Sequence, residues 1–197
     1  MKTIEMCLEV IKNRKKGFLT YDIDFNESYS KEFLNFYCSF MIWNMGHARL
    51  EHDFDIIKSL NQTEKEIALK LVEKNFKNIS LIESFLFALN YFKNKKEVEE
   101  FIKRQLVECV DGLFFHSYIN ILRSLKEQRV EIDIDFDEAI KVVMEKGNSE
   151  EIINLLWSCE TLVGRKRFEI YKYYKNSENI KIREAVQEIL HFYDYTE

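Results

Sequence analysis

The chain has 197 residues, of which 46% are hydrophobic and 32% charged, with a net charge of −5, five glycines and no proline. Such a balance is typical of a globular protein that is long enough to bury a core. Because proline and glycine supply most of the chemistry of tight turns, the composition disfavours a strand-rich sandwich or barrel and predicts a nearly all-helical chain. The acidic balance disfavours a general nucleic-acid binder.

The sequence contains neither a recognisable targeting signal nor a membrane span. Met1–Lys16 carries Glu5 and Glu9 among its apolar positions and lacks the apolar stretch and cleavage site of a signal peptide. No run of about 18 apolar residues occurs, so we expect a cytoplasmic protein. In that reducing compartment the isolated cysteines are expected to be free thiols, most of them buried: Cys7, Cys38, Cys109 and Cys159.

The spacing of apolar residues predicts about eleven helices. In the last of them, Ile182, Ala185, Val186 and Ile189 follow one another at helical offsets and form one face. The predicted helices cover 3–15, 30–45, 49–60, 64–76, 81–92, 95–110, 113–127, 137–146, 149–161, 165–175 and 179–193. After the first helix they form five pairs with a period of 31 to 39 residues, beginning near Ser28, Asn61, Asn94, Asp133 and Gly164.

Local signals support several of these helix ends. Asn94 and Glu97 have the spacing of a capping box, as do Ser80 and Glu83. Glycine often follows the last residue of a helix, and four glycines lie at such positions: Gly17, Gly112, Gly147 and Gly164.

In several pairs one helix is amphipathic while its neighbour is apolar nearly all round, as in 81–92. A helix of the second kind must be covered on several sides, which a stack of helical hairpins achieves. The sequence therefore predicts an all-α, right-handed α-solenoid, with a compact bundle as the alternative. Trp43 and Trp157 lie in apolar runs and are expected in the core.

The segment Asn179–Leu190 resembles the second helix of a HEAT repeat, with Ile182-Arg183, Ala185 and Leu190 at the matching positions, although the usual proline of the first helix is missing. Two further stretches are similar to small bacterial HEAT-like proteins: Met41-Ile42-Trp43 with His47 and His52-Asp53, and Leu155–Glu160. These relatives include predicted immunity proteins of polymorphic toxin and contact-dependent inhibition systems. The resemblance, over 29–193, implies about five HEAT-like hairpins after an N-terminal helix, in one domain spanning 1–197.

Motifs for catalysis or metal binding are weak. His47, Glu51 and Asp55 recur at four-residue spacing beside His52 and Asp53, but Gly46 interrupts the helix that would align them. Glu188 and His191 form one ExxH pair where di-iron sites need two. Asp133, Asp135 and Asp137 have EF-hand spacing, but Glu138 and Met144 occupy positions that need glycine and glutamate. We therefore expect no catalytic residues, no metal and no cofactor.

Acidic residues gather in two segments. Four carboxylates alternate with apolar residues in the stretch that ends at Glu138, namely Glu131, Asp133, Asp135 and Asp137, and a weaker cluster comprises Asp22, Asp24 and Glu27. The acids could stabilise the start of the next helix, or they could form a negative surface that attracts a basic partner. The two interpretations are compatible.

Together these features favour a protein-binding immunity protein that neutralises a cognate toxin stoichiometrically through these carboxylates. Its partner is expected to be a protein, for example a nuclease toxin, rather than nucleic acid or a membrane, and the unbound protein is expected to be a monomer. Basic stretches at Lys93–Arg104 and Arg165–Arg167 keep open a HEAT-like nucleic-acid binder or DNA glycosylase. A non-inhibitory scaffold or adaptor is the third alternative.

Overall fold

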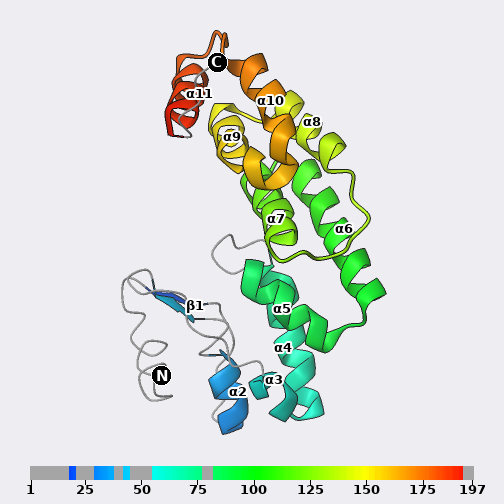
Figure 1. The fold of residues 1–197 in the computed structure, drawn as a ribbon. Coiled ribbons are helices and arrows are strands. Elements are labelled where there is room, and N and C mark those ends of the chain that lie inside the picture. Colours follow the sequence, from blue (N-terminus) through cyan, green and yellow to red (C-terminus); the bar gives the residue numbers. More distant parts are fainter. Residues whose placement is uncertain (1–17, 21–28, 38–41, 45–54, 77–81, 193–197) are drawn as a thin grey trace. The chain divides into compact units, whose positions relative to one another are not determined.

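The computed structural model describes residues 18–20, 29–37, 42–44, 55–76 and 82–192. Its elements are β1 (Phe18–Thr20), α2 (Lys31–Phe36), β2 (Ile42–Asn44), α3 (Asp55–Ser59), α4 (Gln62–Asn75), α5 (Ile82–Phe92), α6 (Lys95–Asp111), α7 (Phe115–Glu127), α8 (Phe136–Lys146), α9 (Ser149–Val163), the 3-10 helix η2 (Gly164–Lys166), α10 (Arg167–Tyr174) and α11 (Ile180–Phe192) (Figure 1). Apart from the two short strands, the described elements are helical, which confirms the all-α class.

The chain divides into two compact units, Met1–Glu100 and Phe101–Glu197, and the division falls within α6. The expectation of a single domain over 1–197 therefore stays a prediction. From α4 onward, the predicted helix boundaries agree with the observed ones to within two residues. The predicted helix 3–15 lies outside the described residues.

The first unit contains the clearest error of the sequence-based prediction. The expected helix over 30–45 is wrong, because α2 ends at Phe36 and Ile42–Asn44 forms a strand. This strand, β2, pairs antiparallel with β1, placing Phe18 opposite Asn44 and Leu19 opposite Trp43. Isoleucine and tryptophan favour strands, so pairing with β1 overrides the helical spacing of the apolar residues. Within the predicted helix 49–60, the described part is helical only at α3.

Aromatic side chains form much of the core of the first unit. α2 packs against α3 and α4, while α5 packs against α3 and α4. Phe33 and Phe36 of α2 are completely buried, and the ring of Phe36 meets that of Phe92 edge to face, with centroids 6.4 Å apart. Such a contact stabilises beyond the burial of apolar area alone, so it fixes the short α2 against α5.

Glu64 joins the starts of α2 and α4. Asn61 accepts a hydrogen bond from the Glu64 amide, and Glu64 Oε2 accepts one from the Asn61 amide at 3.3 Å, which completes a capping box. Its Oε1 accepts a hydrogen bond from the Ser30 amide at 3.0 Å, although the side chain is buried. Burial raises the pKa of Glu64, but the hydrogen bonds from Ser30 and Asn61 outweigh it and hold the pKa below its ordinary value.

We expect Glu64→Ala to destabilise the first unit by about 2 kcal/mol, because buried amide donors lose a charged acceptor. The carboxylate is ionised in the fold at a lower pH than in the unfolded chain, so its contribution is complete above about pH 5 and is lost as the pH falls through the folded pKa. Hydrogen exchange of α2 and α4 at pH 7 and pH 3 measures both effects. Glu66→Gln, at an exposed position of the same helix, is the control. Equal protection in the Glu64 variant and the control would contradict this role.

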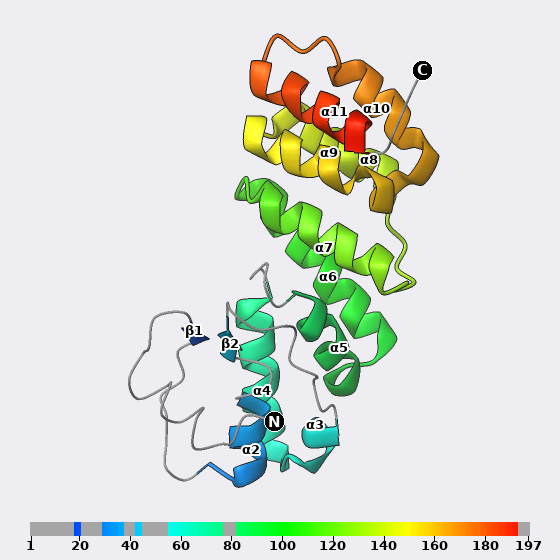
Figure 2. The same cartoon turned by 60° about the vertical axis from the view of Figure 1, so that its left-hand side comes forward.

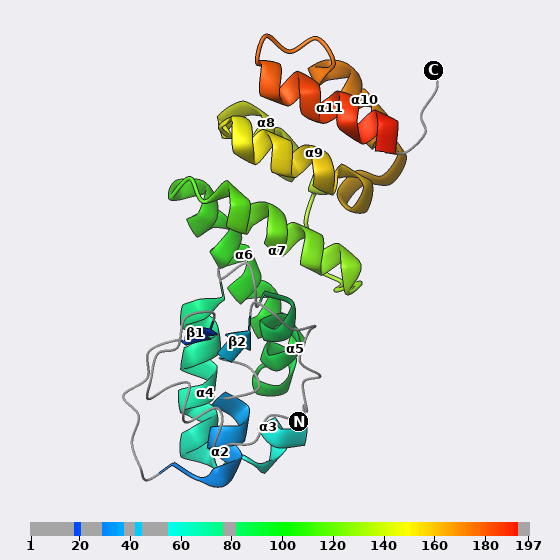
Figure 3. The same ribbon diagram turned by 90° about the vertical axis from the view of Figure 1, so that its left-hand side faces the viewer.

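α9 is the central helix of the second unit and packs against α7, α8, α10 and α11. Leu155, Leu156 and Cys159 of α9 are completely buried. The hydroxyl of Tyr171 on α10 donates a hydrogen bond to the carbonyl oxygen of Leu156 over 3.2 Å. Figures 2 and 3 show α7, α9 and α11 in successive layers, with α8 and α10 each beside the helix that follows it.

Gly112, Gly147 and Gly164 directly follow α6, α8 and α9, as predicted, but they end these helices in different ways. Gly164 has a positive φ of 55° and ends α9 as expected. Gly147 follows α8, and a Cβ there would lie 2.6 Å from the carbonyl oxygen of Val143, so the close approach requires glycine. After α6, however, the left-handed position belongs to Leu113, with a φ of 57°, rather than to Gly112. The amide of Phe114 then bonds to the carbonyl of Cys109, which closes the helix end.

The expectation of buried free thiols is confirmed for Cys109 and Cys159, whereas Cys7 and Cys38 lie outside the described residues. Burial raises the pKa of Cys159 to about 12, with a smaller opposing effect of the charge on Arg167. The reactive thiolate is therefore scarce near neutral pH.

We expect iodoacetamide at pH 8 to modify Cys159 only after the second unit unfolds. Peptide mapping by mass spectrometry follows this cysteine separately from the other three, in native buffer and in denaturant. Comparable rates of modification in the two conditions would contradict the burial of Cys159.

Candidate partner-binding surface

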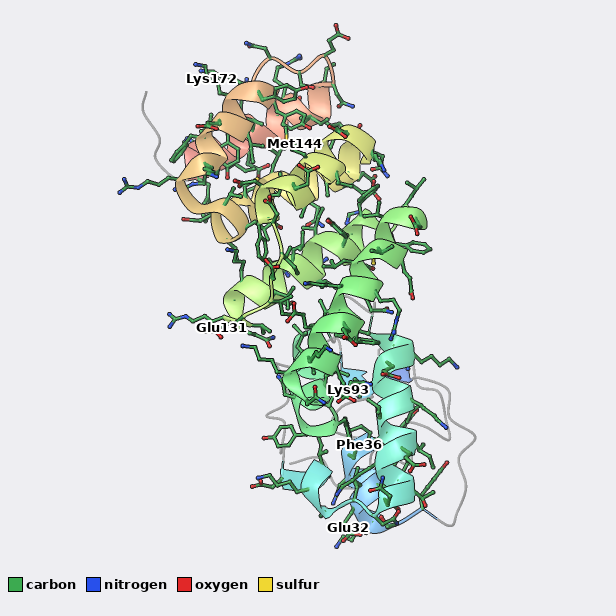
Figure 4. All side chains as sticks on the ribbon, turned by 90° about the vertical axis from the view of Figure 1, so that its right-hand side faces the viewer. Glu32, Phe36, Lys93, Glu131, Met144 and Lys172 are labelled. Carbon is green, nitrogen blue, oxygen red and sulfur yellow. The ribbon has the colours of Figure 1, made fainter. Side chains whose placement is uncertain are left out.

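The connection between α7 and α8 displays the acidic segment, defined here as residues 131–138. Along this segment, which runs from the connection into the first turn of α8, exposed carboxylates alternate with half-buried apolar side chains: Glu131, Asp133, Asp135 and Asp137 are exposed, whereas Ile132, Ile134 and Phe136 are half-buried. Figure 4 labels Glu131 in this connection, before α8. The ammonium of Lys126 lies over the ring of Phe136, 4.1 Å from its centroid. The apolar side chains of the segment are therefore partly covered by the protein, whereas its carboxylates lie at the surface.

Asp135 and Asp137 both have partners within the second unit. Oδ1 of Asp135 accepts hydrogen bonds from the amides of Asp137 and Glu138, at 3.0 and 3.1 Å, and caps the start of α8. Asp137 forms an ion pair with Lys166 of η2, and its hydrogen bond raises the pKa of Lys166 above the ordinary value. The helix-stabilising interpretation is thus confirmed for Asp135.

Nearby lysines reduce the negative charge of the acidic segment without cancelling it. Besides Lys126 and Lys166, Lys141 lies 3.5 Å from the carboxylate of Glu138. Residues 131–138 carry five carboxylates and no cation, so the segment itself is net negative. The second predicted cluster, Asp22, Asp24 and Glu27, lies outside the described residues.

Two hollows adjoin the acidic segment, and Asp137, Val163 and Lys166 line both of them. The first, here called the α8–α10 hollow, has a volume of about 400 Å³ and is lined by Asp137, Ile140, Lys141, Met144, Val163, Lys166, Glu169, Ile170 and Tyr173. The second, of about 450 Å³, includes Ile134 and Phe136 together with the residues that end α9. The Asp137–Lys166 ion pair thus lies at the boundary between two partly apolar depressions.

The basic stretches do not present unpaired cations throughout. Lys93 pairs with Glu73 at 3.0 Å. Arg167 donates a hydrogen bond to the carbonyl oxygen of Gly164 at 3.0 Å and lies 3.8 Å from Glu160. Lys166, paired with Asp137, and Arg167, beside Glu160, therefore link η2 and α10 to α8 and α9.

Some of the histidines and carboxylates considered as metal ligands are not described by the structure. His47, Glu51, His52 and Asp53 lie outside the described residues. In the described part of the chain, no group of three or more histidine, cysteine, aspartate or glutamate side chains is arranged to hold a metal ion. His116 is instead adjacent to Asn154, with 3.2 Å between its Nδ1 and the amide nitrogen of the asparagine.

The expectation that Trp157 belongs to the core is wrong. Its exposed fraction is 41%, because it lies on the face of α9 opposite Leu155 and Cys159. Its ring meets that of Phe192 at 6.2 Å. Helical spacing around α9 could have revealed this position, but the surrounding apolar run concealed it. For Trp43 the structure describes the backbone of β2 but not the side chain, so its expected place in the core stays a prediction.

None of the helices among the described residues combines the length and apolar character that a membrane crossing requires. Comparison of the chain with protein-family models, with curated proteins and with solved structures found no match. The interpretation of the surface around the acidic segment therefore depends on its own geometry and chemistry.

Proposed function

We propose that the protein is an immunity protein of the cytoplasm, which binds a cognate toxin stoichiometrically and has no catalytic activity of its own. One observation supports this proposal above the others: a net negative segment borders two preformed, partly apolar hollows on the second unit. Apolar pockets flanked by charge are suited to protein recognition, because desolvated contacts supply affinity and charges supply orientation and rate.

The proposed architecture is a right-handed HEAT-like solenoid. The layered contacts of α7 with α9 and of α9 with α11 support it for the second unit, since each hairpin of such a stack covers the next. In this arrangement α8 and α10 are neighbouring first helices of successive hairpins, and the α8–α10 hollow lies between them. Stacking thus creates the depression without any dedicated loop.

Inhibition would proceed by occupying a surface of the toxin that its substrate needs. A nuclease toxin must hold an anionic substrate, so its cleft is expected to be basic. The acidic segment would enter or cover such a cleft, and electrostatic attraction would accelerate their encounter. Exposed Asp133, for which the described residues provide no ion pair, is well placed for this contact.

Co-expression with the product of any neighbouring gene that proves toxic on its own tests the proposal. We expect the protein to restore growth, to form a one-to-one complex in isothermal titration calorimetry, and to be monomeric by light scattering before the toxin is added. Binding without restored growth would favour a scaffold or adaptor. Absence of binding to the toxin, together with salt-sensitive binding to DNA, would favour the nucleic-acid alternative.

A further inference from the structure

We infer that Trp157 and Phe192, together with Glu188, form a binding site for an arginine side chain of a partner protein. This inference goes beyond the proposed function, because the site lies on α9 and α11 rather than in the acidic segment. It applies equally to a partner that is not a toxin. Its basis is the combination of two exposed aromatic rings set at a steep angle, a firm attachment between their helices, and an excess of carboxylates around them.

The two rings form an aromatic corner on the surface of the second unit. Trp157 is 41% exposed and Phe192 is 70% exposed. Their ring centroids lie 6.2 Å apart, and the ring planes make an angle of 74°. Aromatic faces attract cations, tryptophan most strongly, and rings set at an angle contact one cation from two sides, as in the aromatic cages that bind ammonium groups. The corner is therefore suited to a cation rather than to an anion.

The aromatic corner is held in place because α9 and α11 are joined at both ends. At the starts of the two helices, the side-chain amide of Asn179 donates a hydrogen bond to the hydroxyl of Ser149 over 2.6 Å. Between this bond and the rings, Leu155 of α9 and Ile189 of α11 are completely buried. Figure 3 shows α11 lying beside α9. A site whose parts are already in place loses little entropy when a ligand binds.

Carboxylates outnumber cations around the aromatic corner. α9 contains three glutamates and neither lysine nor arginine, and α11 has no lysine or arginine from Glu184 to its end. Glu188 is exposed and has no ion pair among the described residues. It precedes Phe192 by one helical turn, which places their Cβ atoms about 5 to 6 Å apart. Arg167 of α10 does approach α9, but it is half-buried and lies beside Glu160, 3.8 Å away. Glu188 is therefore available to a cation that the partner brings.

Arginine fits this arrangement better than lysine does. Its planar guanidinium stacks on an aromatic face and also donates paired hydrogen bonds to a carboxylate. It is more weakly hydrated than an ammonium group, so partial removal from water costs less. The aromatic corner and Glu188 offer both kinds of contact within one helical turn. An acidic side chain of the partner would instead be repelled by Glu188.

An NMR titration of the full chain tests the site without the toxin. The probe is the peptide acetyl-Gly-Arg-Gly-amide, and its control contains citrulline, which keeps the shape of arginine but carries no charge. We expect the arginine peptide to shift the indole N–H signal of Trp157, with a dissociation constant in the millimolar range. That signal is assigned by its loss in Trp157→Phe. Nuclear Overhauser effects should connect the δ-protons of the arginine with both rings. The citrulline peptide should bind about tenfold more weakly, because both the ring contact and the ion pair need the charge.

Matched variants test whether the named residues form the site. Glu188→Gln and Phe192→Leu should each weaken binding of the arginine peptide about threefold, the scale of one exposed ion pair or one cation–π contact. Glu184→Gln changes an exposed glutamate one turn farther from Phe192 and should leave binding unchanged. Tyr173→Leu removes a ring that is also 70% exposed, but on α10, and should likewise leave binding unchanged.

Three results would overturn the inference: no shift of the Trp157 indole signal, equal binding of the arginine and citrulline peptides, or equal effects of the site variants and their controls. Tighter binding of acetyl-Gly-Lys-Gly-amide than of the arginine peptide would overturn the assignment to arginine. Growth protection is measured separately, so a failure of peptide binding is distinguished from a failure of the proposed immunity function.

Discussion

Replacing Leu155 by alanine is expected to destabilise the second unit by about 2 to 5 kcal/mol. Leu155 is completely buried on α9, the helix that packs against α7, α8, α10 and α11. The substitution removes buried methyl groups and leaves a cavity, and both changes lower stability. Because four helices share α9 as their support, we expect the whole second unit to lose protection together rather than one helix end to fray.

Hydrogen exchange followed by mass spectrometry separates this effect from the behaviour of the first unit. Amides of α7, α9 and α11 should exchange at least about thirtyfold faster in the variant, which corresponds to about 2 kcal/mol. Thr161→Ala is the matched control, since it truncates an exposed residue of the same helix and should change stability by no more than about 0.5 kcal/mol. A loss of protection confined to α9 would contradict its central role.

Much of the second unit could be predicted from the sequence, because its helices are amphipathic and their signals are local. Ile182, Ala185, Val186 and Ile189 were expected on one face of the last helix, and all four are buried in α11. In the first unit, the predicted capping box of Asn94 and Glu97 is also present at the start of α6, with reciprocal bonds of 2.9 and 3.0 Å. The spacing of apolar residues and the capping residues are therefore enough to predict a helix that has one buried face.

The errors arise where neighbours in space decide the outcome. Ile42 and Trp43 have apolar spacing compatible with a helix, but β1 provides a strand partner far away in sequence. Leu113 takes a left-handed backbone position that favours glycine, although Gly112 precedes it. Within α9, the position of Trp157 depends on which side of the helix the other helices cover. None of these facts follows from the residues on either side alone.

The candidate surface was only partly visible in the sequence. The alternation of acids from Glu131 to Asp137 indicates an acidic segment, but not that Asp137 binds Lys166 at the start of the following hairpin. Equally, the apolar residues Met144 and Ile170 lie in separate helices, so that only the packing of α8 beside α10 brings them into one hollow. The charge was predictable because it is local, whereas the hollow depends on contacts between hairpins.

Neutralising the four carboxylates Glu131, Asp133, Asp135 and Asp137 to their amides is expected to slow association with the toxin about tenfold or more at low salt. The attraction that accelerates an encounter depends on exposed charge and is screened by salt. The variant should therefore also show a weaker dependence of its association rate on salt. Folding should persist, because asparagine at 135 still caps α8 and the exposed ion pair of Asp137 contributes little.

Stopped-flow measurements at low and moderate salt, with the toxin in excess, give the two association rates. A control variant in which Glu66, Glu145, Glu178 and Glu184 become glutamine alters net charge equally at exposed positions outside the acidic segment. If the segment forms the contact, the control should slow association much less, because only charges near the interface are strongly felt across a screened solution. Equal slowing in both variants would assign the effect to net charge. An unchanged rate in the segment variant would remove the segment from the interface and direct attention to the exposed pair of Trp157 and Phe192, which lies outside the segment.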